Sequence, residues 1–194
     1  MEKEAYIFLG AIVAAIIGYA AARLTSGVQL KIARDNSDKD LKLQSDRLAD
    51  ERLKSEISLE REKLERLHKI LSAISFENSQ TMSYIQSSHT ELSDFRRRYI
   101  DNCDRLHDAL AITALYYPGM SESVRVIFGQ ANCFWGYQEG VIRIDIKENE
   151  QGWQSNLSKV LDAGTEINKR VKDLQYSIAE RGKELNQALQ RTSR

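Results

Sequence analysis

The chain has 194 residues, with 28 basic and 28 acidic side chains, one proline and ten glycines. So few helix breakers, together with 29% charged residues, predict an all-α protein built from long helices. The zero formal charge argues against a nucleic-acid-binding domain, which would show an excess of basic residues. The two cysteines form no CxxC pair, so we expect reduced thiols rather than a disulfide framework.

An uncharged run of eighteen residues, AYIFLGAIVAAIIGYAAA, begins at Ala5 and ends at Ala22. As a helix it would be roughly 27 Å long, close to the ~30 Å hydrocarbon thickness of a bilayer. We therefore predict that residues 1–26 form a single transmembrane anchor. A secretory signal peptide is the alternative, because the three final alanines resemble a cleavage site. The acidic Glu2 and Glu4 argue against it, since such peptides begin with basic residues.

Basic residues are distributed unequally on the two sides of this run. Only Lys3 precedes it, whereas five basic residues follow within about twenty positions. Positively charged flanks stay on the cytoplasmic side, which predicts a single-pass protein of the plasma or inner membrane with its N-terminus outside. The basic residues after the run are Arg23, Lys31, Arg34, Lys39 and Lys42.

Small residues recur every four positions on one face of the predicted span. They are Gly10, Ala14, Gly18 and Ala22. In lipid, such a face lets two helix backbones approach closely, and packing then drives association. This spacing predicts self-association of the span.

Residues 27–75 are predicted to form a juxtamembrane joint followed by a charged helical stalk. Thr25-Ser26-Gly27 can end the membrane helix, and Ser37 can cap the next one. From about Asp38 the helical pattern runs without a break to Tyr117-Pro118-Gly119. Its apolar seam alternates three and four apart, as a dimeric or higher coiled coil requires; an isolated solvated helix is the alternative. The seam residues are Leu64, Leu67, Leu71 and Ile74.

Residues 76–194 are predicted to form a cytoplasmic three-helix bundle with antiparallel neighbours. The apolar face widens near residue 76, which suits packing against several helices. The predicted helices cover about 76–116, 122–148 and 153–191. Because the last helix is longer than the middle one, its end is expected to run back along the stalk or to pair with another subunit.

No motif of catalytic quality is present. Cys103 and His107 lie four apart and would make half of a metal site, but no second pair completes it. The chain contains no HExxH, P-loop or GxSxG motif. We therefore predict no catalytic residue, no cofactor and no metal.

A partner surface is predicted at two places. Arg96, Arg97 and Arg98 form the one basic cluster, although nearby aspartates suggest an ordinary solvated face. Tyr117 and Tyr137 are the aromatic residues most expected to remain exposed.

The leading hypothesis is a non-enzymatic, membrane-anchored helical scaffold or adaptor. It would self-associate through span and stalk, and present its bundle to an unidentified protein partner. One alternative is a membrane-perturbing effector whose oligomerisation clusters the transmembrane helices. Another is an unrecognised metal-dependent or hydrolytic enzyme in the bundle.

Overall fold

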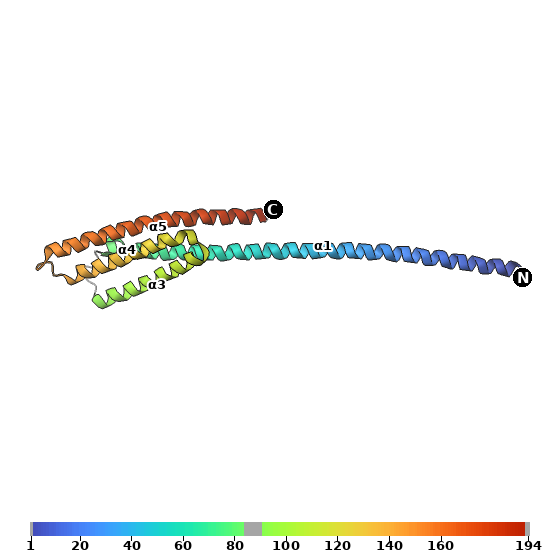
Figure 1. Cartoon of the computed structure of the whole chain (residues 1–194), viewed down its shortest axis with the longest axis horizontal. Helices are drawn as coiled ribbons and strands as arrows, with labels where there is room; N and C mark the ends of the chain where they lie inside the picture. Colours follow the sequence, from blue (N-terminus) through green and yellow to red (C-terminus); the bar gives the residue numbers. More distant parts are fainter. Residues whose placement is uncertain (1, 84–90, 193–194) are drawn as a thin grey trace. The chain divides into compact units, whose positions relative to one another are not determined.

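The computed structural model describes residues 2–83 and 91–192 (Figure 1). Within the first helix, the side chains of residues 2–9, 11–16, 20, 21 and 27 lie outside this description. All the described secondary structure is helical, which confirms the all-α prediction. The helices are α1 (Glu2–Glu77), α3 (Leu92–Tyr116), α4 (Pro118–Arg143) and α5 (Glu150–Thr192), and residues 80–83 are also helical.

The chain divides into two compact units, residues 1–53 and residues 54–194. The first contains only the N-terminal part of α1. The second contains the rest of α1 together with α3, α4 and α5, which form a helical bundle. The predicted boundary between stalk and bundle near residue 75 is therefore placed about twenty residues too late.

The first unit is helical throughout its described residues, including 25–40. The predicted joint in that stretch is wrong. No proline interrupts it, and the single glycine at 27 costs at most about 1 kcal/mol against alanine. Strong helix formers on both sides outweigh that cost.

As far as its residues are described, no helix contains a segment long and apolar enough to cross a membrane. Most side chains of the predicted span, including Ala14, lie outside the described residues. Gly10, Gly18 and Ala22 are described, and each is exposed in the single chain. The self-association predicted for this face stays a prediction.

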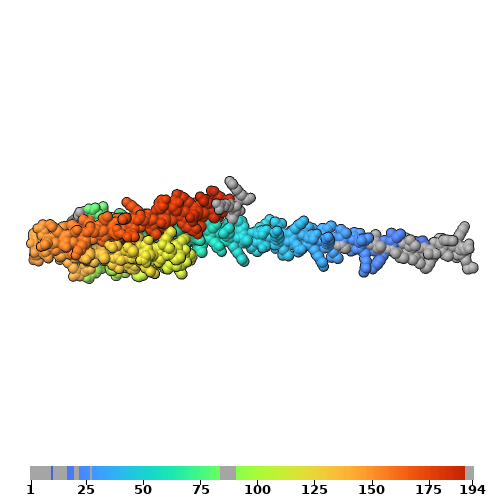
Figure 2. Space-filling model, turned by 45° about the horizontal axis from the view of Figure 1, so that its top comes forward, coloured from blue at the N-terminus to red at the C-terminus, as the bar shows by residue number. Residues whose placement is uncertain are grey.

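The core of the second unit is shared by four helices. Figure 2 shows α4 and α5 lying against one another along one face of this unit. Their apolar residues recur at three- and four-residue spacing, so each helix turns one continuous stripe inward. The largest fully buried apolar side chains are Leu67, Leu71 and Ile74 from α1, Phe95 and Leu106 from α3, Val124, Ile127 and Phe134 from α4, and Val160 and Ile167 from α5.

The apolar seam of the predicted stalk belongs to this core. Leu64, Leu67, Leu71 and Ile74 are between 0% and 4% exposed in the single chain. The seam was correctly identified, but its partner was not, because α5, α3 and α4 of the same chain cover it. The three-helix prediction was one helix short for the same reason.

The predicted helix over 76–116 is also wrong, because α1 ends at Glu77 and α3 begins at Leu92. Asn78 and Ser79 cause the break. The Asn78 amide donates a hydrogen bond to the Ile74 carbonyl oxygen at 2.7 Å, and the Ser79 hydroxyl accepts one from the backbone N–H of Met82 at 3.3 Å. Such local side-chain bonds compete with helix continuation and begin a new helix instead.

The two remaining helices begin earlier than predicted. Helix α4 begins at Pro118 rather than 122, because proline is well suited to the first helical position. It ends at Arg143, before a turn in which Asp145 accepts a hydrogen bond from the Lys147 backbone N–H at 2.9 Å. Helix α5 begins at Glu150. The Asn149 side chain accepts a hydrogen bond from the Gly152 backbone N–H at 2.9 Å and so caps the N-terminus of this helix.

Helix α5 runs antiparallel along α1. One of the two expectations for the end of the last helix was that it would run back along the predicted stalk, and this is the arrangement observed. Ser75 donates a hydrogen bond to Asn168, and Gln175 donates one to Ser72 at 2.9 Å. Further along, Arg181 forms an ion pair with Glu60 at 3.0 Å. The residue numbers fall along α1 as they rise along α5, which defines the antiparallel pairing.

Gly164 allows α5 to approach the end of α1 closely. A Cβ atom at this position would lie 2.7 Å from the Asn78 backbone oxygen and 3.5 Å from the Phe134 ring. The backbone oxygen cannot move without disturbing the break after α1. Gly164 therefore fixes the distance between α5 and that break.

We expect Gly164→Ala to destabilise the bundle by about 1–3 kcal/mol, because it overpacks a fixed contact. Gly136→Ala is the matched control, since nothing lies within 4 Å of its Cβ position. That substitution should be neutral or stabilising by up to about 1 kcal/mol, through helix propensity. Urea unfolding followed by tryptophan fluorescence measures both. Equal effects of the two variants would contradict the close approach.

Candidate partner-binding site

Tyr117 is a structural residue rather than part of a partner surface. Its side chain is only 8% exposed, and its hydroxyl donates a hydrogen bond to the Glu60 backbone oxygen at 2.9 Å. Burial, assisted by the nearby Glu60 charge, raises the pKa of Tyr117 to about 12. The prediction of exposure is wrong because the start of α4 folds back against α1. The contact joins the turn between α3 and α4 to the bundle's first helix.

The Arg96–Arg98 cluster is paired with carboxylates. Arg96 on α3 forms an ion pair with Glu139 on α4 at 2.8 Å, and Arg97 pairs with Asp94 of its own helix at 3.0 Å. Arg98 forms an ion pair with Glu77 at the end of α1. Two of the three arginines therefore bridge helices, which leaves little free positive charge for a partner.

Glu139 is the centre of a small charge network. It accepts hydrogen bonds from Arg96 at 2.8 Å and from Arg143 at 2.8 Å. These two hydrogen bonds, that from Arg96 first, hold the pKa of Glu139 below its usual range. The network joins α3 to the last turn of α4.

Tyr137 remains exposed, at 36%, on the surface of α4. The Lys159 ammonium lies 4.7 Å from the centre of its ring, which is the geometry of a cation–π contact. Tyr137 is thus the one predicted partner residue whose side chain is both exposed and outside an ion pair.

Cys103 and His107, which could form half of a metal site, are not joined by further ligands among the described residues. His107 packs edge-on against the Phe128 ring, with 5.0 Å between the ring centres. Cys103 is half-buried and Cys133 is exposed, and both are free thiols. Among the described residues, no group of three or more histidine, cysteine or acidic side chains is arranged to hold a metal ion.

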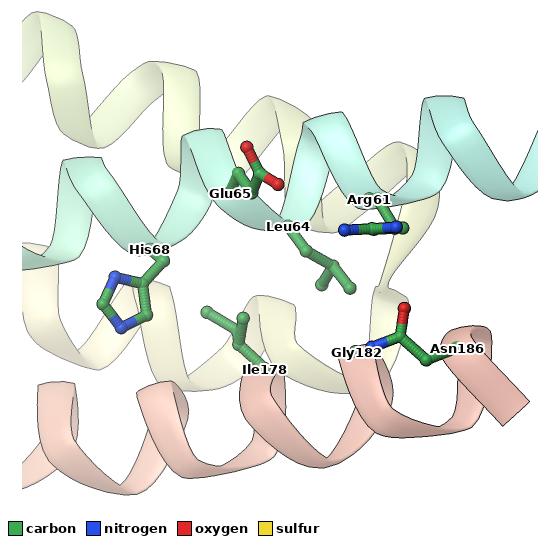
Figure 3. Close-up of a pocket in the computed structure, with 7 residues that line it drawn as sticks. All are labelled: Arg61, Leu64, Glu65, His68, Ile178, Gly182 and Asn186. Atoms are coloured by element: carbon green, nitrogen blue, oxygen red, sulfur yellow. The ribbon is translucent and has the colours of Figure 1, made fainter.

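A hollow lies between α1 and α5 on the surface of the second unit. Figure 3 shows residues of both helices pointing into it, over the floor made by Leu64 and Ile178. Its volume is about 220 Å³. Its rim is polar, and comprises Arg61, Glu65 and His68 from α1 with Gly182 and Asn186 from α5.

Gly182 accounts for the depth of this hollow. Nothing lies within 4 Å of the position that its Cβ would occupy, so any larger side chain would project into open space. A second hollow of about 400 Å³ adjoins the first, shares Arg61 and Glu65 with it, and extends to Leu189. The two together follow the α1–α5 pair for several turns.

The sequence prediction missed this site because its residues carry no motif. They come together only when α5 pairs with α1, and the predicted stalk had α1 facing another subunit. The available signal was Gly182, which lies between Ile178 and Leu185 on the apolar face of α5 and leaves that face without a side chain there.

Comparison with protein-family models, with characterised proteins and with solved structures finds no match.

Removing the Tyr117 hydroxyl tests its structural role. We expect Tyr117→Phe to cost about 1 kcal/mol at neutral pH, through loss of the hydrogen bond to Glu60. The pKa of Tyr117 is about 12 in the folded chain and about 10 when unfolded. Its contribution is therefore complete below pH ~10 and is lost as the pH rises from there toward ~12.

The measurement is urea unfolding of the wild type and of Tyr117→Phe between neutral pH and pH ~11. The stability gap between the two proteins should narrow as the pH rises through the upper part of this range. Tyr137→Phe, at the exposed position, controls for the loss of a phenol. A gap that stays constant, or widens, would contradict the assignment.

The Arg98 and Arg97 ion pairs form a second matched test. The side chain of Arg98 is 28% exposed and bridges two helices, whereas that of Arg97 is 73% exposed and pairs within its own helix. We expect Arg98→Ala to cost about 1 kcal/mol and Arg97→Ala to stay within about 0.5 kcal/mol of the wild type. Thermal unfolding at low and high salt measures both; an equal or larger loss for Arg97→Ala would refute the ranking.

Proposed function

We propose that the protein is a membrane-tethered helical scaffold, anchored by its N-terminal run and presenting the bundle on the cytoplasmic side. The observation that carries this proposal is the uncharged run from Ala5 to Ala22 at the beginning of α1. The same helix ends inside the bundle core, where Leu67, Leu71 and Ile74 are buried. One helix therefore contains both the apolar run and a structural part of the bundle.

Several features support a binding rather than a catalytic role. The bundle has a continuous apolar core, and several of its charged residues form ion pairs between helices. What its surface offers is a hollow with polar walls and the exposed Tyr137. Such surfaces suit recognition of another macromolecule. We propose self-association and an additional protein partner as the scaffold's working state.

A charged residue placed in the middle of the predicted span tests whether the chain is inserted in the membrane. The full chain should stay in the membrane fraction after alkaline carbonate extraction. Lysine at position 14, in Ala14→Lys, should release a large part of it, because a lysine at the centre of a span costs about 2.5–3.5 kcal/mol. Gln44→Lys adds the same charge outside the run and should leave extraction unchanged. Complete extraction of the wild type would refute the anchor.

Chemical labelling of the exposed Cys133 thiol tests on which side of the membrane the bundle lies. In intact cells a membrane-impermeant maleimide should leave Cys133 unmodified, and should label it only after permeabilisation. Cys133→Ser supplies the background from the half-buried Cys103. Labelling of Cys133 in intact cells would reverse the proposed orientation.

A further inference from the structure

A notch in the surface between α3 and α4 is lined by three aromatic rings. Phe95 and Tyr99 lie one turn apart on α3, and Trp135 on α4 packs beside both. The ring centres of Phe95 and Tyr99 lie 4.8 Å and 5.8 Å from that of Trp135. The volume of the notch is about 120 Å³. It is therefore a small aromatic pocket, separate from the hollow between α1 and α5.

Gly136 leaves this notch open. It lines the notch next to Trp135, and nothing lies within 4 Å of the position that its Cβ would occupy. The Tyr99 hydroxyl donates a hydrogen bond at 3.2 Å to Asn132, which lies one turn before Gly136. This bond links Tyr99 to α4 beside the notch. The chain thus builds the walls of a pocket and places no side chain at position 136 to fill it.

The charge network beside the notch has an excess of one positive charge. Arg96 and Glu139 both line the notch, and Arg143 pairs with the same Glu139 carboxylate. Two guanidinium groups therefore share one carboxylate. The side chains of Arg96 and Arg143 are 53% and 54% exposed. Each guanidinium group has several N–H donors, so its bonds to Glu139 leave donors for a further carboxylate.

The size of the notch indicates what fills it. Small-molecule sites usually measure about 300–1,000 Å³, whereas a cavity of about 150 Å³ accepts benzene. At about 120 Å³, the notch holds one six-membered ring and little more. Aromatic walls favour another ring, packed edge-to-face or offset. Pockets that take a single aromatic side chain are typical of the centres of protein–protein interfaces.

We propose that the notch binds one phenylalanine side chain of a protein partner, and that Arg96 and Arg143 bind carboxylates of the residues next to that phenylalanine. Phenylalanine fits best, since a tyrosine hydroxyl would need a hydrogen-bond partner and the double ring of tryptophan exceeds the volume. This proposal rests on the partner-binding role proposed above. It specifies the chemistry of the partner, which is an aromatic residue within an acidic segment.

Titration with short peptides of the full chain, isotope-labelled for NMR and purified in detergent, tests this site. The chain has two tryptophans, and Trp153→Phe identifies the indole N–H resonance of Trp135. We expect acetyl-Asp-Phe-Asp-amide to shift that resonance saturably, because the incoming ring packs against the indole. Acetyl-Asp-Ala-Asp-amide lacks the ring and acetyl-Lys-Phe-Lys-amide reverses the charge, so each should bind at least about tenfold more weakly.

Gly136→Leu should fill the notch and abolish the shift. Gly129→Leu is the matched control, because it lies two turns earlier on α4, away from the notch, and its Cβ position is equally open. Leucine favours helix, so urea unfolding should show both variants to be at least as stable as the wild type. Arg143→Gln removes a guanidinium group that pairs only within α4, and should weaken binding of the acidic peptide by about fivefold.

Three results of the titration would overturn the proposal: a saturable shift that survives in Gly136→Leu, equal binding of the phenylalanine and alanine peptides, or no saturable shift in the wild type. Phenylacetate combines the ring and a carboxylate in a small molecule. If it bound as tightly as the acidic peptide, the notch would be a small-molecule site and the proposed partner would be refuted. Carbonate extraction tests the anchor separately, so retention in the membrane without peptide binding would leave the anchored scaffold standing while this site fell.

Discussion

The antiparallel packing of α5 against α1 is the contact on which the rest of the bundle depends. It buries the seam Leu64–Ile74 inside the chain that carries it. Hydrogen bonds and an ion pair fix its register from Ser75 and Asn168 to Glu60 and Arg181. Because α5 covers this seam, the polar residues of α1 beside it, among them Arg61 and Glu65, line the hollow between the two helices.

Two local contacts complete this arrangement, one within the pair and one from the turn between α3 and α4. Gly164 brings α5 against the break at Asn78, and the Tyr117 hydroxyl holds the turn between α3 and α4 to Glu60. Glu60 therefore has two roles, with its backbone oxygen bound to Tyr117 and its carboxylate to Arg181. The hollow lined by Arg61 and Glu65 is therefore positioned by three contacts. These are the pairing of α1 with α5, the close approach at Gly164 and the buried hydroxyl of Tyr117.

Much of this fold could be predicted from periodicity, and the remainder could not for physical reasons. The stripe of Leu64, Leu67, Leu71 and Ile74 identified a buried helix face, but spacing alone does not distinguish a partner in another chain from one in the same chain. The break at Asn78-Ser79 was missed because a heptad frame can be continued through it. Side-chain capping there outweighed a weak apolar pattern.

The candidate site was harder to predict than the fold. Tyr117 was expected to be exposed because it adjoins Pro118, yet the turn folds inward and buries it. Arg98 was expected on a partner surface, but Glu77 reaches it only because α1 ends there. The hollow depends on residues more than a hundred positions apart, from Arg61 to Asn186, and no short motif encodes that proximity.

The most direct test of this account asks whether α5 covers α1 of its own chain. Ser72→Cys and Gln175→Cys, at a contact of 2.9 Å between the native side chains, can be placed on one copy or divided between two co-expressed copies. The structure predicts a disulfide only when both substitutions are on the same chain, seen as a monomer of altered gel mobility. An intermolecular disulfide from the divided pair would contradict it, and would return the seam to a coiled coil between subunits.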